Sequence, residues 1–131
     1  MIIDSSALLA IVLREPDAGR YLDAMLAEDK RRMSVANWFE ASMVVDGRGN
    51  STAAHRFDEF TGAARLELCP VSTRQAALAR KAWRDYGRGN HKARLNFGDC
   101  FAYALARDTG EKLLFKGNDF IHTDIEPALK D

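Results

Sequence analysis

The sequence is short of several features that would define a protein class. No apolar run approaches the roughly 20 residues needed to cross a bilayer, so no membrane-spanning helix is expected. The first residues include no basic stretch, which predicts that there is no signal peptide and favours a cytoplasmic location. The two cysteines, Cys69 and Cys100, lack CxxC spacing and are expected to be free, buried thiols rather than disulfide partners or zinc ligands.

Net charge is also absent. Lysine plus arginine and aspartate plus glutamate each total 19, so bulk charge gives no sign of nucleic-acid binding. Any such function must rest on local clusters of basic residues. No serine stands at a useful spacing from one of the 3 histidines, so a nucleophile with a base partner is not evident either.

The 131 residues fit one domain, 1–131, with no linker or internal repeat. Short apolar segments alternate with segments whose apolar residues recur at helical spacing. Strands are expected at 1–3, 33–35, 65–71 and 112–115, and a fifth short strand in the remainder. One helix is expected directly after residue 4, a second begins at about residue 16, and a third follows the second strand and ends at about residue 46. Further helices are expected at 51–64, 73–86 and 97–107. This alternation predicts a three-layer α/β/α fold with a central, mostly parallel sheet of four to five strands.

Asp4 stands where the first predicted strand meets a helical pattern, in MIIDSSALLAI. The carboxyl ends of parallel strands form the edge at which open α/β sheets bind ligands, so Asp4 is a candidate site residue. Asp4, Ser5 or Ser6 could instead simply cap the helix that follows. In the company of the other acids described below, we expect Ser5 or Ser6 to position the start of the helix, which leaves Asp4 free to bind an ion.

Two further acids fall inside apolar helices. Glu40 lies in ANWFEASMVV and is expected to share a helix face with Asn37. Asp99 lies in NFGDCFAYALA, within the first turn of its helix. Carboxylates in such surroundings are rarely buried unless they are paired or bind a cation, although an acid near a helix N-terminus is also favoured by the helix dipole.

Asp119, in KGNDF just after the last predicted strand, completes the set, with a turn or cap role as its simpler interpretation. If the first and fourth predicted strands are neighbours, Asp4 and Asp119 emerge at the same sheet edge, within reach of the helices that bear Glu40 and Asp99. Carboxylates that converge in one pocket repel one another unless a cation compensates them. Oxygen ligands without histidine or cysteine select a hard ion, Mg²⁺ or Mn²⁺, which can activate a water and stabilise charge on a phosphodiester.

The most basic stretch of the chain runs from Arg84 to Arg94, with Tyr86 and two glycines among its charges. A solvated loop is the simple interpretation. Flexible positive charge beside an aromatic ring is also how proteins bind a phosphate backbone. The candidate RNA contacts in this segment are Arg88, His91, Lys92 and Arg94.

Four segments together resemble the PIN-domain family and, within it, the VapC-type toxins of bacterial toxin-antitoxin pairs. MIIDSSALLAI resembles the opening strand and D-[ST]-[ST]-A motif, and WFEASMVV the helix with its glutamate. NFGDCFAYALA resembles the central acid on an alanine-rich helix, and LLFKGNDF the terminal motif. In that last segment Phe115 and Gly117 stand where a common form of the motif has Thr and a further Asp, and Lys116 is unusual at this place.

The resemblance covers nearly the whole chain and implies a Mg²⁺- or Mn²⁺-dependent endoribonuclease that uses an activated water. It implies that Asp4, Glu40, Asp99 and Asp119 are catalytic metal ligands and that Ser6 is a polar residue supporting the site. It also implies a homodimer and a small antitoxin protein that covers the acidic pocket.

Two other classes are compatible with parts of the pattern. A phosphoacceptor receiver domain has a similar parallel sheet, but it needs adjacent acids after the first strand and an acceptor Asp after the third, which MIIDSS and LELCPVS do not supply. A noncatalytic PIN-like module that binds RNA or protein remains the main alternative, because the terminal motif is incomplete. Such a module would bind RNA without turnover in Mg²⁺ or Mn²⁺.

Overall fold

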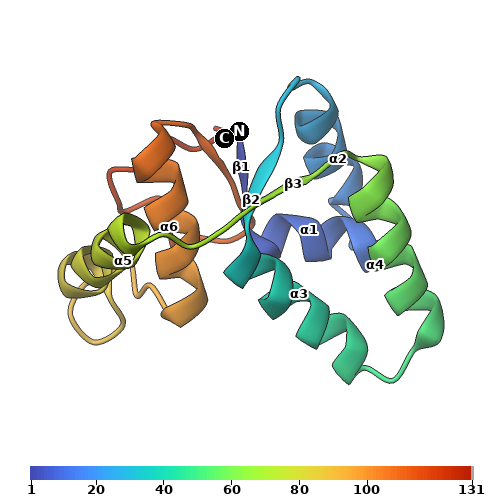
Figure 1. The fold of residues 1–131 in the computed structure, drawn as a ribbon, viewed down its shortest axis with the longest axis horizontal. Helices are drawn as coiled ribbons and strands as arrows, with labels where there is room; N and C mark the ends of the chain where they lie inside the picture. Colours follow the sequence, from blue (N-terminus) through green and yellow to red (C-terminus); the bar gives the residue numbers. More distant parts are fainter. Residues whose placement is uncertain (131) are drawn as a thin grey trace.

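The fold is known from a computed structural model that describes residues 1–130 (Figure 1). Its helices and strands follow one another in this order: β1 (Ile2–Ile3), α1 (Ser5–Val12), α2 (Ala18–Leu26), β2 (Arg32–Ser34), α3 (Val35–Gly47), α4 (Ser51–Ala63), β3 (Glu67–Cys69), α5 (Thr73–Tyr86), α6 (Phe97–Thr109) and β4 (Leu113–Leu114).

The four strands form one parallel sheet in the order β3-β2-β1-β4. Ile2 in the central strand β1 pairs with Arg32 of β2 on one side and with Leu113 of β4 on the other. The chain leaves β1 towards β2 and returns from β3 to β4, so the topological switch point lies between β1 and β4. Ligands bind at such points in open parallel sheets, and the predicted adjacency of the first and fourth strands is confirmed.

Alternation along β1 and β4 divides the core into two layers. Ile3 and Leu114 pack in a cluster with side chains of α1 to α4, whereas Ile2 and Leu113 pack in a second cluster with side chains of α5 and α6. Successive strand residues point to opposite faces of a sheet, so a two-residue strand supplies one side chain to each layer. Figure 1 shows α5 and α6 on one side of the sheet and α1 to α4 on the other, which is the predicted three-layer α/β/α architecture.

The strands are shorter than the apolar patterns suggest. The third strand was predicted over 65–71 but spans Glu67–Cys69. Val35, predicted as strand, is the first residue of α3, because the hydroxyl of Ser34 accepts a hydrogen bond from the Ala36 N–H at 3.3 Å and caps that helix.

The segment after β4 does not contain a fifth strand within residues 1–130, so the sheet has the smaller of the two predicted sizes. Residues 126–128 instead run beside the outer edge of β4. The Leu113 N–H donates to the Glu126 carbonyl at 2.9 Å, and the Ala128 N–H donates to the Leu113 carbonyl at 2.8 Å. These bonds cover an edge that would otherwise expose backbone donors and acceptors.

The two thiols differ in their surroundings. Both are free, as predicted, but only Cys100 is buried, while Cys69 at the end of the edge strand β3 is partly exposed. The prediction of burial was therefore wrong for Cys69, since an outer strand has a neighbour on one side only. Across residues 1–130 no helix combines the length and the apolar character that spanning a membrane requires.

Candidate active site

Asp4 lies between β1 and α1 and has two different carboxylate oxygens. Its N–H donates to the Leu114 carbonyl at 2.9 Å, which continues the β1–β4 pairing beyond the strand end. Its Oδ2 caps α1 by accepting from the N–H of Ser6 at 3.1 Å and from the Ser6 hydroxyl at 2.5 Å. Its Oδ1 is buried and has no hydrogen-bond partner within residues 1–130. The expectation that Ser5 or Ser6 would cap the helix in place of Asp4 was therefore wrong: Asp4 caps with one oxygen and presents the other.

Ser6 connects this carboxylate to the loop after β4. Its hydroxyl oxygen donates to Asp4 Oδ2 and accepts from the Lys116 backbone N–H at 2.9 Å. The hydroxyl thus holds the Asp4 side chain and the 116–119 turn in one arrangement. The Lys116 side chain points elsewhere, because its Nζ pairs with Glu15 at 3.0 Å and with Asp17 at 2.9 Å.

Glu40 reaches the site from the middle of α3. Its Oε1 accepts from the Ser5 hydroxyl at 2.7 Å and from the Asn37 side-chain amide at 3.4 Å. The same Asn37 amide donates to the Gly98 carbonyl at 2.9 Å, so α3 is tied to the start of α6. A Cβ added at Gly98 would overlap the Glu40 carboxylate, which would have to move from its present position.

Asp99 occupies the third position of α6 and takes part in a capping box. Its N–H donates to Asn96 Oδ1 at 2.8 Å, while its Oδ2 accepts from the Asn96 N–H at 3.0 Å. The side chain is held close to the helix start and is buried. The structural role considered from the sequence, an acid favoured at a helix N-terminus, is thus present together with a position in the acidic cluster.

Asp119 lies on the exposed turn after β4, at the rim of the cluster. It lines a hollow of about 270 Å³ with Arg88, Arg94 and Asn96. Gly117 in the same turn has a φ of 103°, a backbone conformation in which a residue with a side chain is strained.

The electrostatics show that the four acids influence one another. Burial, with the nearby charge of Glu40, raises the pKa of Asp4 to about 6 despite its bonds to Ser6. Burial raises the pKa of Asp99 as well, and the neighbouring carboxylates of Asp4 and Asp119 raise it further. Glu40, Asp4, Asp99 and Asp119 therefore form a continuous series of interacting carboxylates.

No group of three His, Cys, Asp or Glu side chains in the described part of the chain is arranged to hold a metal ion as it stands. The residues nevertheless fit a hard divalent cation. The Oδ1 atom of Asp4 is buried without a partner, and the neighbouring acids destabilise one another's ionised forms. A cation removes both costs, and carboxylates without histidine or cysteine are the ligands that Mg²⁺ and Mn²⁺ prefer.

The predicted RNA contacts divide into two groups. Arg88 and Arg94 line the hollow beside Asp119. His91 and Lys92 line only the neighbouring hollow. The His91 ring also packs edge-on against Tyr86 with 5.1 Å between centroids, and its Nδ1 accepts from the Ala93 N–H at 3.0 Å.

Sequence reasoning gave no site role to three residues that shape the site, although it placed Asn37 on the same helix face as Glu40. Ser5 and Asn37 donate to Glu40, and Gly98 makes room for it. Two of them carried a usable signal. Asn37 precedes Glu40 by one helical turn, and Gly98 is a glycine within the first turn of a helix, where it needs a packing reason.

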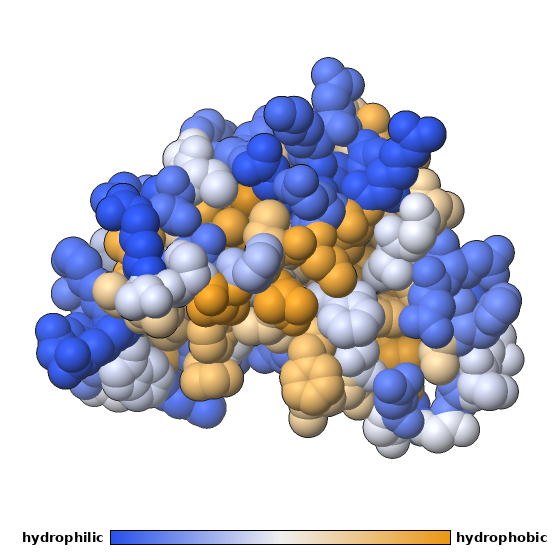
Figure 2. All heavy atoms as spheres, viewed as in Figure 1, coloured by the Kyte–Doolittle hydropathy of each residue, from blue (hydrophilic) through white to orange (hydrophobic). Residues whose placement is uncertain are grey.

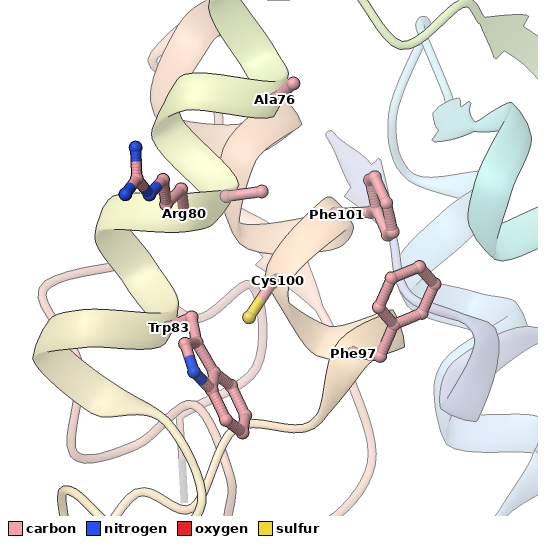
Figure 3. A pocket seen from close by; sticks show the side chains of 7 residues that line it. Ala76, Arg80, Trp83, Phe97, Cys100 and Phe101 are labelled. Carbon is pink, nitrogen blue, oxygen red and sulfur yellow. The ribbon is translucent and has the colours of Figure 1, made fainter.

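A separate hollow of about 450 Å³ lies between α5 and α6 and is mostly apolar. Figure 3 shows Trp83 of α5 facing Phe97 and Phe101 of α6, with Cys100 between them. Ala76, Ala79 and Arg80 complete its lining. It contains none of the four acids and was not predicted from the sequence.

The Gly98→Ala substitution should displace the Glu40 carboxylate and weaken Mn²⁺ binding by about tenfold, since one well-placed charged ligand contributes at least 1.4 kcal/mol. Isothermal titration calorimetry with Mn²⁺ measures the affinity of each variant. Gly62→Ala is the matched control, because Gly62 also lies in a helix but has nothing within 4 Å of an added Cβ. Unchanged Mn²⁺ affinity in Gly98→Ala would show that Glu40 does not need this space.

The free energy of unfolding of the metal-free protein should fall as pH rises from 4 to 7. The pKa of Asp4 is about 6 in the folded state against the ordinary value of 3.8 in the unfolded chain, so the folded state binds its proton more tightly and loses that advantage as pH passes through this window. The difference corresponds to about 3 kcal/mol. Urea unfolding in EDTA should show a weaker pH dependence for Asp4→Asn, which keeps a capping side chain. Identical pH profiles would contradict the assignment to Asp4.

Comparison with known proteins gives a consistent family assignment. Residues 1–126 match the PIN domain family. The chain is 48% identical over 130 residues to Ribonuclease VapC28 of Mycobacterium tuberculosis, covering 98% of each chain. It is 44% identical over 126 residues to Ribonuclease VapC of Mycolicibacterium smegmatis, covering 95% of this chain and 97% of the relative.

Solved structures agree in fold. The structure of VapC20 from Mycobacterium tuberculosis, described as a Sarcin-Ricin loop cleaving toxin, superposes with a TM-score of 0.74 at 16% identity and covers 95% of each chain. VapBC2 from Rickettsia felis, solved bound to a DNA fragment from its promoter, gives a TM-score of 0.76 at 12% identity and covers 96% of this chain and 94% of that one. This chain therefore belongs to the PIN-domain family, among its VapC members.

Proposed function

We propose that this protein is a Mg²⁺- or Mn²⁺-dependent endoribonuclease and the toxin of a toxin-antitoxin pair. The observation that carries the proposal is the buried, unpartnered Oδ1 of Asp4 in a series of carboxylates at the switch point of a parallel sheet. The ribonuclease names of its relatives support RNA as the substrate.

In this proposal Asp4, Glu40 and Asp99 hold the cation, and Asp119 contributes from the rim. The bound ion supplies an activated water and charge stabilisation at the phosphodiester. The chain's own residues fix the geometry beforehand. Ser6 orients Asp4, Ser5 and Asn37 orient Glu40, and Asn96 orients Asp99.

Preorganisation of this kind matters because a ligand that must reorient during the reaction loses part of its catalytic effect. Each of the three acids Asp4, Glu40 and Asp99 has at least one hydrogen-bond donor that restricts its side chain. Asp119 differs, since it is exposed and shares its hollow with two arginines. We assign Asp119 to the side of the site at which RNA enters.

A protein partner is also part of the proposal. Several large apolar side chains are exposed: Phe97 at 78%, Phe39 at 59% and Met43 at 58%. Figure 2 shows apolar side chains gathered across the centre of one face of the molecule. Contiguous exposed apolar surface is typical of interaction sites. The exposed apolar surface supports the expected homodimer and antitoxin partner, and one of the structural relatives is described as a toxin-antitoxin complex from Klebsiella pneumoniae.

We place the protein in the cytoplasm, where its RNA substrate is found.

Asp99→Asn should reduce RNA cleavage in Mg²⁺ or Mn²⁺ by at least about 100-fold, because losing one charged ligand removes several kcal/mol of charge stabilisation. The asparagine oxygen can still accept from the Asn96 N–H, so the helix cap and the circular dichroism spectrum should be preserved. Cleavage is measured on labelled RNA by gel electrophoresis and, in cells, as growth inhibition.

Asp108→Asn is the matched control, since Asp108 lies at the far end of the same helix and pairs with Arg74 at 2.7 Å. Retained metal-dependent cleavage by folded Asp99→Asn would refute the proposed role. Tight RNA binding by the unsubstituted protein with no turnover in either metal would indicate the noncatalytic RNA-binding alternative.

A further inference from the structure

Two arginines stand beside the acidic cluster, and residues 1–130 supply neither side chain with a partner. Arg88 and Arg94 line the hollow that contains Asp119 and Asn96. Within residues 1–130 neither guanidinium takes part in an ion pair or a side-chain hydrogen bond. The nearby Lys116, in contrast, is paired with Glu15 and Asp17. The unpaired charge next to Asp119 therefore belongs to these two arginines.

The loop that carries them is held in place by its backbone. The Arg88 N–H donates to the Leu95 carbonyl at 2.9 Å, and the Leu95 N–H donates to the Tyr86 carbonyl at 3.0 Å, which closes the loop at its base. Ala93 and Leu95 are buried on either side of the exposed Arg94. The loop is thus anchored in the core by its apolar residues and presents its arginines outward.

His91 belongs to this scaffold. Its edge-on contact with Tyr86 and its bond from the Ala93 N–H fix the tip of the loop from inside. A second hollow, of about 570 Å³, is lined by Arg88, Arg94 and residues 89–92, which include Lys92. Arg88 and Arg94 line both hollows and therefore stand at the boundary between the acid site and the rest of the loop.

The chemistry of this boundary favours a phosphate. A guanidinium group presents a planar fork of N–H donors that matches phosphate oxygens, and two of them side by side attract an anion. An anion placed there lies next to the carboxylates and their expected cation, where the backbone of a bound nucleic acid would continue.

We propose that Arg88 and Arg94 form a phosphate-binding subsite for the RNA backbone phosphate adjacent to the one that is cleaved, and that the strand continues into the second hollow past Lys92. The proposal rests on the ribonuclease function for the identity of the ligand. It separates the two arginines, which contact RNA, from His91, which orders the loop.

The test is RNA binding in EDTA, where no metal-dependent cleavage occurs, with a fluorescently labelled single-stranded RNA of mixed sequence and anisotropy as the signal. Arg88→Gln and Arg94→Gln should each weaken binding about tenfold, as expected for the loss of a charge-assisted hydrogen bond. Each should also reduce the slope of log Kd against log salt concentration by about one, because one phosphate contact is lost.

Arg84→Gln is the matched control. Arg84 is an exposed arginine near the end of α5 that lines neither hollow, and its substitution should leave both quantities unchanged. Unchanged affinity and salt slope in Arg88→Gln and Arg94→Gln would overturn the proposal, as would an equal loss in Arg84→Gln. Wild-type binding without any cleavage in Mg²⁺ or Mn²⁺ would refute the ribonuclease function while leaving the subsite intact. Cleavage with an unchanged KM in both arginine variants would overturn the subsite while leaving the ribonuclease function intact.

Discussion

The structure depends on a buried carboxylate at the point where β1, β4 and α1 meet. Asp4 caps α1 and continues the pairing of β1 with β4, and this places its second oxygen in a buried position where residues 1–130 offer it no donor. A lone buried carboxylate is costly, and here Glu40 and Asp99 add to that cost rather than relieve it. Without a ligand the raised pKa values of Asp4 and Asp99 favour bound protons, and a divalent cation is the natural replacement for them.

Each acid around Asp4 has a structural task that fixes its position. Asp99 completes the capping box of α6, and Glu40 is held by donors from α1 and from its own helix. The charges at the rim are arranged differently. Lys116 is turned away to the α1–α2 connection, whereas Arg88 and Arg94 stand beside Asp119. An interior of negative charge with guanidinium groups at its border suits a cation inside and a polyanion passing over it.

Much of this could be predicted from the sequence, because the patterns involved are local. Alternating apolar segments predicted the three layers, and Glu40 and Asp99 stand out by lying in helices that are otherwise largely apolar. The separate roles of the two Asp4 carboxylate oxygens could not be predicted, since they depend on which oxygen accepts from Ser6. The space that Gly98 leaves for Glu40 is a contact between helices far apart in the chain, and no local pattern encodes it. The early end of β2 was also missed, because Ser34 caps a helix at a place where the apolar run continues.

The central claim is that the acids at the switch point bind a divalent cation, and crystals soaked in Mn²⁺ test it most directly through anomalous diffraction. The expected result is a peak in direct contact with Asp4 Oδ1 and the Asp99 carboxylate, with Glu40 beside it. An absent peak, or a peak away from these side chains, would contradict the account.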